Sequence, residues 1–215
     1  MKIYDNNLND YFDKTYCINL DKRKDRWEEC VTEFDKWGIS GVTRHSAVDG
    51  TKFDRTKIPS RLKDGELGLV ITNLDIIKDC LVNDCGNILI LEDDVVFNDE
   101  IIKISEYMSE LPEDWDILYF GGNHNAHMGA APPTKVNDKV CKLHNTFTTH
   151  CIGINKRMFK TIIDLLHKYD NPIDVAYSVL QKTHNIYSFY PAIATQRVGF
   201  SDIMNSNMDY RWLIK

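Results

Sequence analysis

The most constraining feature of the sequence is a five-residue run, 87–91, that leads directly into three acidic residues. The run reads Asn-Ile-Leu-Ile-Leu, and Glu92, Asp93 and Asp94 follow it. A short, uninterrupted apolar run of this kind is typical of a strand that is covered on both faces, as in the centre of an α/β sheet. Ligands of α/β proteins bind beyond the carboxyl ends of such strands. The pattern therefore predicts a buried strand that delivers carboxylates to a binding site.

The rest of the chain alternates between strand and helix patterns. Strands are predicted where β-branched, aromatic and apolar residues cluster, and helices where apolar residues recur every three or four positions. The predicted strands cover 15–20, 42–48, 87–91, 116–120, 148–155 and 186–190. The predicted helices cover 26–37, 66–81, 99–111, 156–169 and 174–182, with a long loop over 123–142. This order predicts an α/β sandwich with a mostly parallel sheet.

The first predicted helix has recognisable boundary residues. Asp21 can serve as its N-cap, because a short acidic side chain accepts hydrogen bonds from the first free N–H groups of a helix. Gly38 can end it, since glycine readily adopts the left-handed conformation found after many helices. Strand, charged turn and helix together predict a crossover unit at the start of the sheet.

Length and composition narrow the class of protein. A chain of 215 residues with 43% apolar residues can form one domain, 1–215, with a complete core. The chain has 32 acidic and 26 basic residues, and the net charge of -6 disfavours a nucleic-acid partner. Neither a secretory signal nor a transmembrane segment is recognisable, so we expect a soluble, cytoplasmic protein. The six cysteines form no C-x-x-C pair and are expected to be reduced and buried.

The three acidic residues are suited to holding a divalent cation. Ionised carboxylates beside an apolar strand repel one another, and a cation removes that cost. Carboxylate oxygens are ligands that Mg²⁺ and Mn²⁺ prefer. Since side chains alternate along an extended segment, Glu92 and Asp94 should point one way and Asp93 the other. We therefore expect Asp94 to bind the metal directly and Glu92 to bind it directly or through water.

Three other interpretations of the acidic residues stay open on the sequence alone. They could simply end the strand and favour the start of the following helix. A phosphoryl-accepting receiver domain also has acidic residues after an apolar strand, but that motif opens its domain, whereas 86 residues precede Asn87. A haloacid-dehalogenase-type phosphatase requires Asp at the position of Glu92. The last two fit the chain less well than a cation site.

Several motifs occur in order along the chain. They are Tyr16 to Trp27, Ala47 to Gly50, Gly65 to Gly68, Leu91 to Asp94, Pro172 to Asp174 and Ser201 to Ile203. In this order and spacing they resemble the lipooligosaccharide-type glycosyltransferases of family 25, and glycosyltransferases of large DNA viruses of algae look similar. The resemblance implies a nucleotide-binding GT-A fold, an α/β/α sandwich. It also implies a UDP-sugar donor and Mn²⁺ or Mg²⁺ at the acidic motif.

The resemblance further implies which residues bind the donor. They are Asn19, Leu20, Arg23, Arg26, Ala47, Asp49, Gly50, Asn73 and Asp93. Asn19 and Leu20 would lie beside the uridine, and the forked donors of Arg23 or Arg26 would reach the base or the diphosphate. Asp49 would accept a hydrogen bond from the ribose, although its segment could also be an ordinary turn. Asn73 stands where family members often have Ser-His, and its amide would meet the base.

The remaining implied roles concern the metal and the acceptor. Gln196 falls near the place from which family members recruit a further metal ligand. An inverting transfer needs a general base beside the acceptor hydroxyl, and Asp174 matches the family segment. Asp174 could equally be an N-cap of the helix over 174–182. Tyr210 and Trp212 are candidates to cover the site or to pack on the domain.

The sequence thus predicts a metal-dependent glycosyltransferase. It would transfer a sugar from a UDP-sugar to a glycan acceptor, with inversion. Negative charge builds on the departing diphosphate, and a cation at the end of the strand offsets it. The alternative is a non-catalytic sugar-nucleotide or glycan-binding domain of the same fold.

Overall fold

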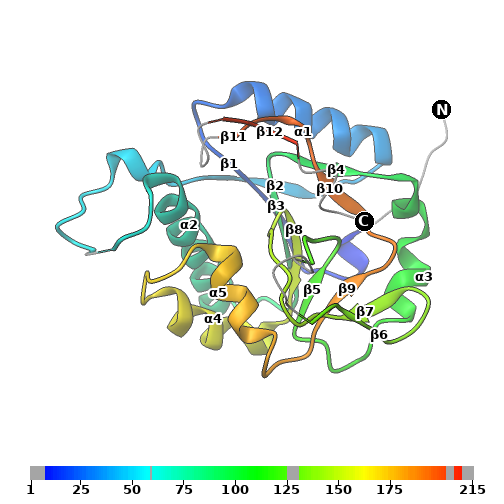
Figure 1. The fold of residues 1–215 in the computed structure, drawn as a ribbon. Coiled ribbons are helices and arrows are strands. Elements are labelled where there is room, and N and C mark those ends of the chain that lie inside the picture. Colours follow the sequence, from blue (N-terminus) through cyan, green and yellow to red (C-terminus); the bar gives the residue numbers. More distant parts are fainter. Residues whose placement is uncertain (1–7, 59, 125–130, 202–205, 210–215) are drawn as a thin grey trace.

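An eight-stranded sheet with helices on both faces forms the frame of the protein (Figure 1). The computed structural model describes residues 8–58, 60–124, 131–201 and 206–209. The helices are α1 (Lys24–Trp37), α2 (Asp64–Val82), α3 (Ile104–Ser109), α4 (Phe159–Leu166) and α5 (Ile173–Leu180). The strands are β1 (Lys14–Asn19), β2 (Val42–Ser46), β3 (Ile88–Glu92), β4 (Val95–Phe97), β5 (Ile117–Tyr119), β6 (Thr134–Lys135), β7 (Val140–Lys142), β8 (Cys151–Ile154), β9 (Ile186–Phe189), β10 (Ala194–Gln196), β11 (Gly199–Ser201) and β12 (Ser206–Met208).

The order of strands in the large sheet is β2-β1-β3-β8-β5-β9-β7-β6. The predicted α/β class is confirmed, but the sheet is mixed, because β7 and β8 run against their neighbours. Leu91 at the end of β3 pairs with Cys151 at the start of β8. β8 therefore enters the sheet where β3 leaves it and must run back. The residues just before β8 consequently lie next to the acidic residues after β3.

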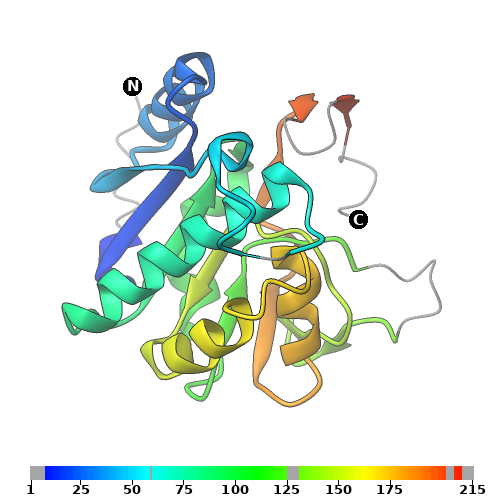
Figure 2. The same cartoon turned by 90° about the vertical axis from the view of Figure 1, so that its left-hand side faces the viewer.

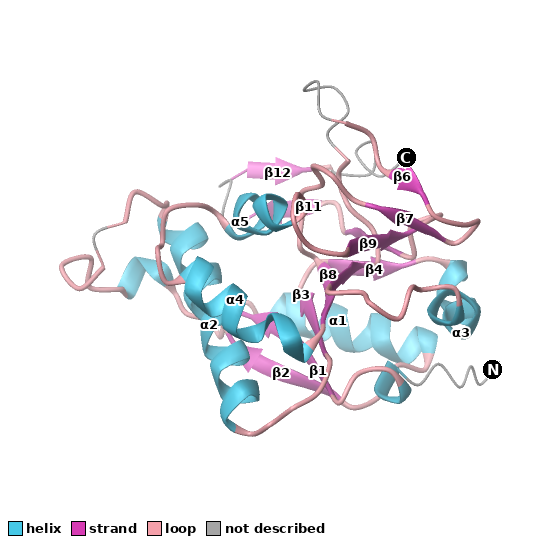
Figure 3. Cartoon of the chain, turned by 90° about the horizontal axis from the view of Figure 1, so that it is seen from below, coloured by secondary structure: helices cyan, strands magenta, loops and turns pink. Residues whose placement is uncertain are grey.

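Alternation along the strands divides the core into two halves. Ile88 and Ile90 of β3 pack into the cluster that α2, α4 and α5 cover, whereas Leu89 and Leu91 pack into the cluster beneath α1 and α3. Figure 3 shows these two sets of helices on opposite sides of the sheet. All four side chains are at most 1% exposed, and burying each one contributes about 1.5–3 kcal/mol. The strand predicted from the apolar run is thus central and covered on both faces.

The helical face formed by α2, α4 and α5 closes one side of the molecule (Figure 2). The longest α-helix among the described residues, α2, crosses this face with α4 packed beside it. Its buried side includes Leu67, Val70, Leu74 and Ile77, which keep the predicted three- and four-residue spacing. The N-terminus of α2 lies at the carboxyl ends of the parallel strands and so reaches the site described below.

The first crossover confirms the C-terminal boundary of α1 and corrects its N-terminal one. Gly38 ends α1 with a left-handed φ of 68°. The helix begins at Lys24, and Arg23 occupies the N-cap position without a side-chain capping bond. Asp21 lies in a turn too far before the helix to cap it. Its carboxylate instead accepts hydrogen bonds from Arg44 and Ser46.

The C-terminal part of the described chain adds strands that the sequence patterns do not predict. β10 pairs antiparallel with β4, which places Gln196 opposite Val95. Two short strands, β6 and β7, lie within the segment predicted to be a loop. Strands of two or three residues are too short to show a hydrophobic period, so their partners rather than their sequence reveal them. Asp202, Ile203, Tyr210 and Trp212 lie outside the described residues.

Two predictions about the whole chain can be checked against the described residues. All six cysteines are free and buried, as expected. In the part of the chain that the structure describes, no helix combines the length and apolar character needed to cross a membrane.

Candidate active site

A cavity of about 900 Å³ lies at the carboxyl ends of β1, β2 and β3. Its walls come from Ile18 and Leu20, from 47–51 after β2, and from 92–94 after β3. The starts of α2 and α5, the segment before β8, and the residues Lys22, Arg26, Asn123 and Gln196 complete it. Cavities of this size hold cofactors and other small molecules. The site thus lies where an open α/β sheet is expected to bind its ligand.

Two of the sequence motifs meet at the edge of this cavity. A Cβ atom on Gly50 would lie 1.8 Å from the Asp64 carbonyl oxygen, and one on Gly68 would lie 2.3 Å from the Val48 carbonyl oxygen. Only glycine permits backbones to approach so closely at these two positions. The Val48 N–H also donates to Thr72 Oγ1 at 2.9 Å. These contacts hold the loop after β2 against the start of α2 and so shape the cavity wall.

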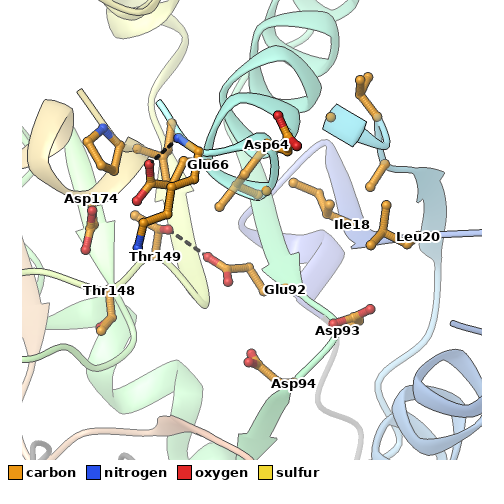
Figure 4. A pocket seen from close by; sticks show the side chains of 18 of the residues that line it. Ile18, Leu20, Asp64, Glu66, Glu92, Asp93, Asp94, Thr148, Thr149 and Asp174 are labelled. Atoms are coloured by element: carbon orange, nitrogen blue, oxygen red, sulfur yellow. Dashed lines mark hydrogen bonds between the residues drawn. The ribbon is translucent and has the colours of Figure 1, made fainter. Parts of the chain in front are cut away.

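The middle acidic residue, Asp93, has its carboxylate compensated by protein groups. Asn19 Nδ2 donates to Asp93 Oδ2 at 2.7 Å, and Arg26 Nη1 donates to Asp93 Oδ1 at 2.5 Å. Cys30 Sγ donates to the Asp93 carbonyl oxygen at 3.3 Å. In Figure 4 the Asp93 side chain points away from Glu92 and Asp94. The charge of Asp93 is therefore used to fix Arg26 and Asn19, and only 8% of the residue is exposed.

The flanking residues Glu92 and Asp94 face the cavity with less compensation (Figure 4). Thr149 Oγ1 donates to Glu92 Oε1 at 2.7 Å, and Gln196 Nε2 approaches Asp94 Oδ2 at 3.4 Å. Burial raises the pKa of Glu92 to about 8, and the neighbouring charge of Asp94 adds to this. Burial likewise raises the pKa of Asp94 to about 6, although Arg26 opposes the shift. For both carboxylates, burial therefore outweighs the interactions that favour the ionised form.

Two buried side-chain oxygens at this end of the cavity accept no hydrogen bond at all. They are Asp94 Oδ1 and Gln196 Oε1, and the pairing of β10 with β4 brings their residues together. An unsatisfied buried acceptor is costly, so it indicates a missing donor or cation. Both atoms are hard oxygen ligands of the type that Mg²⁺ or Mn²⁺ prefers. The donor set of Glu92, Asp94 and Gln196 therefore fits such an ion.

The number of available ligands also bears on the kind of metal site. Among the described residues, no three His, Cys, Asp or Glu side chains converge on one point. A closed cage of three or more carboxylate, imidazole or thiolate ligands is thus absent from the described residues. Mg²⁺ usually binds one or two carboxylates and keeps its other positions for water and phosphate oxygens. The site matches that open type of coordination.

Asp174 lies across the cavity from the acidic residues. It is the second residue of α5, whose N-cap is Pro172, so the alternative role of Asp174 as an N-cap is wrong. Its carboxylate accepts a hydrogen bond from the Val175 N–H at 2.8 Å and another from the Thr148 N–H. Burial raises the pKa of Asp174, and these two hydrogen bonds oppose the shift. A carboxylate held in this way can accept a proton from a neighbouring hydroxyl group.

Thr148 is a lining residue that the sequence does not reveal. Its φ of 67° is left-handed, which is unusual for a β-branched residue and often marks a functional site. Its Oγ1 atom is buried without a hydrogen-bond partner, while its N–H group binds Asp174. Neither Thr148 nor Thr149 belongs to a motif, and only the position of β8 beside β3 brings them to the cavity.

The structure divides the predicted site residues into two groups. Those that line the cavity are Leu20, Arg26, Ala47, Asp49, Gly50, Glu92, Asp93, Asp94, Asp174 and Gln196. The other three, Asn19, Arg23 and Asn73, do not contribute to the lining. Asn19 is buried behind Asp93, Arg23 pairs with Asp25 at 2.9 Å, and Asn73 Nδ2 donates to the Leu69 carbonyl oxygen within α2. Asn73 is only 3% exposed because it lies on the core side of that helix.

Comparison with known proteins relates this chain to a class of sugar-transferring enzymes. Residues 12–176 match the family described as "Glycosyltransferase family 25 (LPS biosynthesis protein)". The match covers well over half of the chain, so the chain belongs to glycosyltransferase family 25. The family predicted from the motifs is confirmed, and with it the enzyme class that the family defines.

Two curated relatives illustrate the similarity. The "Procollagen lysyl hydroxylase and glycosyltransferase" of Acanthamoeba polyphaga mimivirus is 30% identical over 160 residues, which are 62% of this chain and 17% of the relative. "Procollagen galactosyltransferase 2" of Mus musculus is 25% identical over 152 residues, which are 61% of this chain and 24% of the relative. The chain spans less than a quarter of the length of either relative.

Solved structures show more distant likenesses. A glycosyltransferase involved in the glycosylation of the major capsid of PBCV-1 is 12% identical, with a TM-score of 0.46 over 79% of this chain and 74% of that chain. Mouse xyloside xylosyltransferase 1 is 9% identical, with a TM-score of 0.43 over 78% of this chain and 68% of that chain.

Proposed function

We propose that the cavity binds a UDP-sugar together with Mn²⁺ or Mg²⁺ and transfers the sugar to a glycan acceptor with inversion. The observation that carries this proposal is the pair of unsatisfied buried oxygens, Asp94 Oδ1 and Gln196 Oε1, in a cavity that Glu92 also faces. Family membership supplies the sugar-transfer chemistry. The relatives named as galactosyltransferases make a UDP-hexose the first donor to test.

The metal-binding residues in this proposal are Asp94, Glu92 and Gln196. A divalent ion held there would supply positive charge against the diphosphate that departs with the nucleotide. These ligands are half-buried in the cavity wall, where the effective dielectric constant is lower than in water and the attraction for a cation is stronger. Thr149 fixes one oxygen of Glu92 and so limits the rotation of that carboxylate.

The donor-binding side of the cavity combines apolar and charged groups. Ile18, Leu20 and Ala47 offer apolar contacts to a base or ribose. Arg26 lines the same region, and its guanidinium is held by Asp93. Arginine suits phosphate recognition because its donors form a rigid planar fork. Asp49 lies beside Gly50 and can accept a ribose hydroxyl proton in a hydrogen bond.

Asp174 is the proposed general base. Its burial raises its pKa, which makes the ionised carboxylate a better proton acceptor than an exposed one. The backbone N–H groups of Val175 and Thr148 fix its orientation. In an inverting transfer the acceptor hydroxyl attacks the anomeric carbon from the face opposite the departing diphosphate, and Asp174 would take the hydroxyl proton.

Binding and turnover of sugar nucleotides test the proposal directly. A thermal-shift series with UDP, UDP-galactose and UDP-glucose, each without metal, with Mn²⁺ and with Mg²⁺, should show stabilisation that needs both nucleotide and metal. Product mass after incubation with oligosaccharide acceptors, and with a procollagen peptide, then reports transfer. Tight UDP binding without turnover on any acceptor would favour a binding domain, and no binding of UDP with either metal would reject the proposal.

The general base has its own test. Replacing Asp174→Asn should lower the transfer rate by about 100- to 10,000-fold and leave the UDP affinity nearly unchanged. Asp164→Asn, an exposed aspartate on α4, is the matched control and should transfer at the wild-type rate. A nearly normal rate for Asp174→Asn would overturn the assignment.

The proposal also includes the setting in which the enzyme acts. Residues 1–215 would act as one catalytic domain without a nucleic-acid partner. All six cysteines are free, which is usual for proteins of reducing compartments. This supports a cytoplasmic site of action, where the cysteines would stay reduced. Fractionation of expressing cells with an antibody to the chain would test the location.

A further inference from the structure

Arg44 on β2 lies outside the cavity but connects to it through hydrogen bonds. Its Nε atom donates to Asn19 Oδ1 at 2.9 Å, and its Nη2 atom donates to Asp21 Oδ1 at 2.8 Å. The guanidinium also lies over the ring of Trp27 at 5.9 Å from the ring centre. Groups from β1, from the turn after it and from α1 thus fix the Arg44 side chain in one orientation.

The contacts of Arg44 continue to the cavity wall. Asn19 Nδ2 donates to Asp93 Oδ2 at 2.7 Å, and the other oxygen of Asp93 accepts from Arg26 Nη1 at 2.5 Å. The path therefore runs from β2 through the end of β1 and the turn after β3 to α1. These three strands are neighbours in the sheet, which brings Arg44, Asn19 and Asp93 together, and α1 supplies Arg26.

The chemistry of this path allows only one orientation of the Asn19 amide. A guanidinium can only donate hydrogen bonds, and an ionised carboxylate can only accept them. The amide oxygen must therefore face Arg44, and the amide nitrogen must face Asp93 and the Arg23 carbonyl oxygen, to which it donates at 3.0 Å. Asn19 is only 1% exposed, so water cannot readily replace a lost partner. Without Arg44, the Asn19 side-chain oxygen would be a buried acceptor that has lost its hydrogen bond from Arg44 Nε.

We propose that Arg44 is a positioning residue for nucleotide binding, acting through Asn19 and Asp93 on the guanidinium of Arg26. This rests on the proposed function, in which Arg26 contacts the donor. Arg44 itself does not line the cavity. It sets the Asn19 amide, which holds one oxygen of Asp93, so that the other oxygen presents Arg26 to the donor. Arg44 on β2 thus controls the orientation of Arg26 on α1.

An ordinary surface ion pair would not have this effect. The partner of Arg44 in its ion pair, Asp21, has a side chain that is 73% exposed. Pairs of this kind contribute little to stability because water screens them. The measurable consequence of removing Arg44 should therefore come through the buried amide of Asn19.

A double-mutant cycle with UDP as the probe tests the inference. Titration calorimetry with UDP and Mn²⁺ is carried out on the wild type, Arg44→Met, Asn19→Ala and the double variant. Arg44→Met should weaken UDP binding about tenfold in the wild-type background and less than about twofold when Asn19 is already alanine. Arg44→Lys keeps one donor and should recover part of the affinity.

Controls separate the possible outcomes. Arg157→Met removes an arginine that pairs with Asp116 at 2.8 Å far from the cavity, and its UDP affinity should stay at the wild-type value. Equal losses for Arg44→Met with and without Asn19, or no loss in either background, would overturn the positioning role. A wild type that binds no UDP would instead reject the proposed function. In that case additive changes of melting temperature for Arg44→Met and Asp93→Asn would overturn the connection itself.

Discussion

Asp93 and Asp94 are neighbours in the sequence, yet the structure treats their charges in opposite ways. Asp93 turns toward α1 and has a partner for each carboxylate oxygen. Asp94 turns toward the cavity, and one of its oxygens is buried without any partner. Asp93 therefore stabilises the fold, whereas Asp94 belongs to a site that still has an unsatisfied acceptor.

This difference shows how a sheet edge can combine rigidity with binding capacity. The compensated side, Asp93 with Asn19 and Arg26, is complete without a ligand. The side with Glu92, Asp94 and Gln196 leaves acceptors unmatched, and burial raises the pKa of both its carboxylates. Substitution of Asp93 should therefore change stability as well as UDP affinity through Arg26, whereas substitutions on the second side should change the transfer rate with little loss of stability.

The largest expected effect comes from Asp94→Asn. We expect transfer to fall by at least about 1000-fold, because an amide replaces the charged metal ligand. The free energy of unfolding should stay the same or rise, since the substitution removes a buried and poorly compensated charge. Initial rates with saturating Mn²⁺ and urea denaturation provide the two measurements. A large loss of stability would contradict the contrast with Asp93.

The reciprocal substitution, Asp93→Asn, should destabilise the fold, in addition to its effect on UDP binding through Arg26. It removes the charge that compensates Arg26, whose side chain is only 15% exposed. Breaking such a nearly buried pair costs about 3 kcal/mol. Urea denaturation measures this loss directly. If Asp93→Asn and Asp94→Asn were equally stable, the two carboxylates would not differ as described.

His150 should make the stability of the protein depend on pH. It contacts Ala194 of β10, the strand that carries Gln196. Burial lowers its pKa from 6.5 to about 4, and its Nδ1 atom has no partner, while Nε2 contacts the Ala194 carbonyl oxygen. The unfolded chain binds the proton more tightly, so the stability from neutral His150 is complete above pH 6.5 and is lost as the pH falls toward 4.

This acid sensitivity amounts to at most about 3 kcal/mol. His150→Gln keeps a donor for Ala194 but cannot titrate, so its stability should change less between pH 6.5 and pH 4 than that of the wild type. Urea denaturation at both pH values gives the comparison. Parallel pH profiles for the two proteins would show that His150 is not the responsible group.

The smallest expected effect concerns the left-handed backbone of Thr148. Alanine normally stabilises a chain relative to glycine, but a left-handed φ costs a residue with a Cβ atom about 1–2 kcal/mol. Thr148→Gly should therefore be about 1 kcal/mol more stable than Thr148→Ala. Both variants lack the hydroxyl group, so the difference between their melting temperatures reports the cost of the left-handed backbone at position 148. The usual order, with alanine more stable, would show that position 148 is unstrained.

The strand and helix patterns predict much of the frame. β3 is recognisable because the core covers both of its faces, which leaves no polar residue within Ile88–Leu91. α2 is recognisable because one of its sides is buried along most of its length. By contrast, β4 and β10 are three residues each, and such pieces carry no period that distinguishes them from loops.

The site was predicted in its residues more than in its geometry. The motif at the end of β3 points to Glu92 and Asp94, because ligand-binding residues gather where the parallel strands end, whereas Asp174 at the start of α5 was predicted from the family resemblance alone. The burial of Asn19 and the contact between Arg44 and Asn19 depend on which strands become neighbours. Thr148 depends on the reversed direction of β8, which no local pattern shows. The sequence thus indicates which side chains have suitable chemistry, but it does not indicate which distant segments pair with one another.

The pairing of β10 with β4 has a consequence for how the chain responds to ligand. Gln196 lies beyond residue 176, where the family match ends, and the Arg197 N–H donates to the Asp94 carbonyl oxygen at 2.6 Å. An ion bound by both Asp94 and Gln196 would stabilise the pairing of β10 with β4. Amide hydrogen exchange of residues 194–197 should then slow when Mn²⁺ and UDP are added together, which makes this short strand a built-in reporter of occupancy.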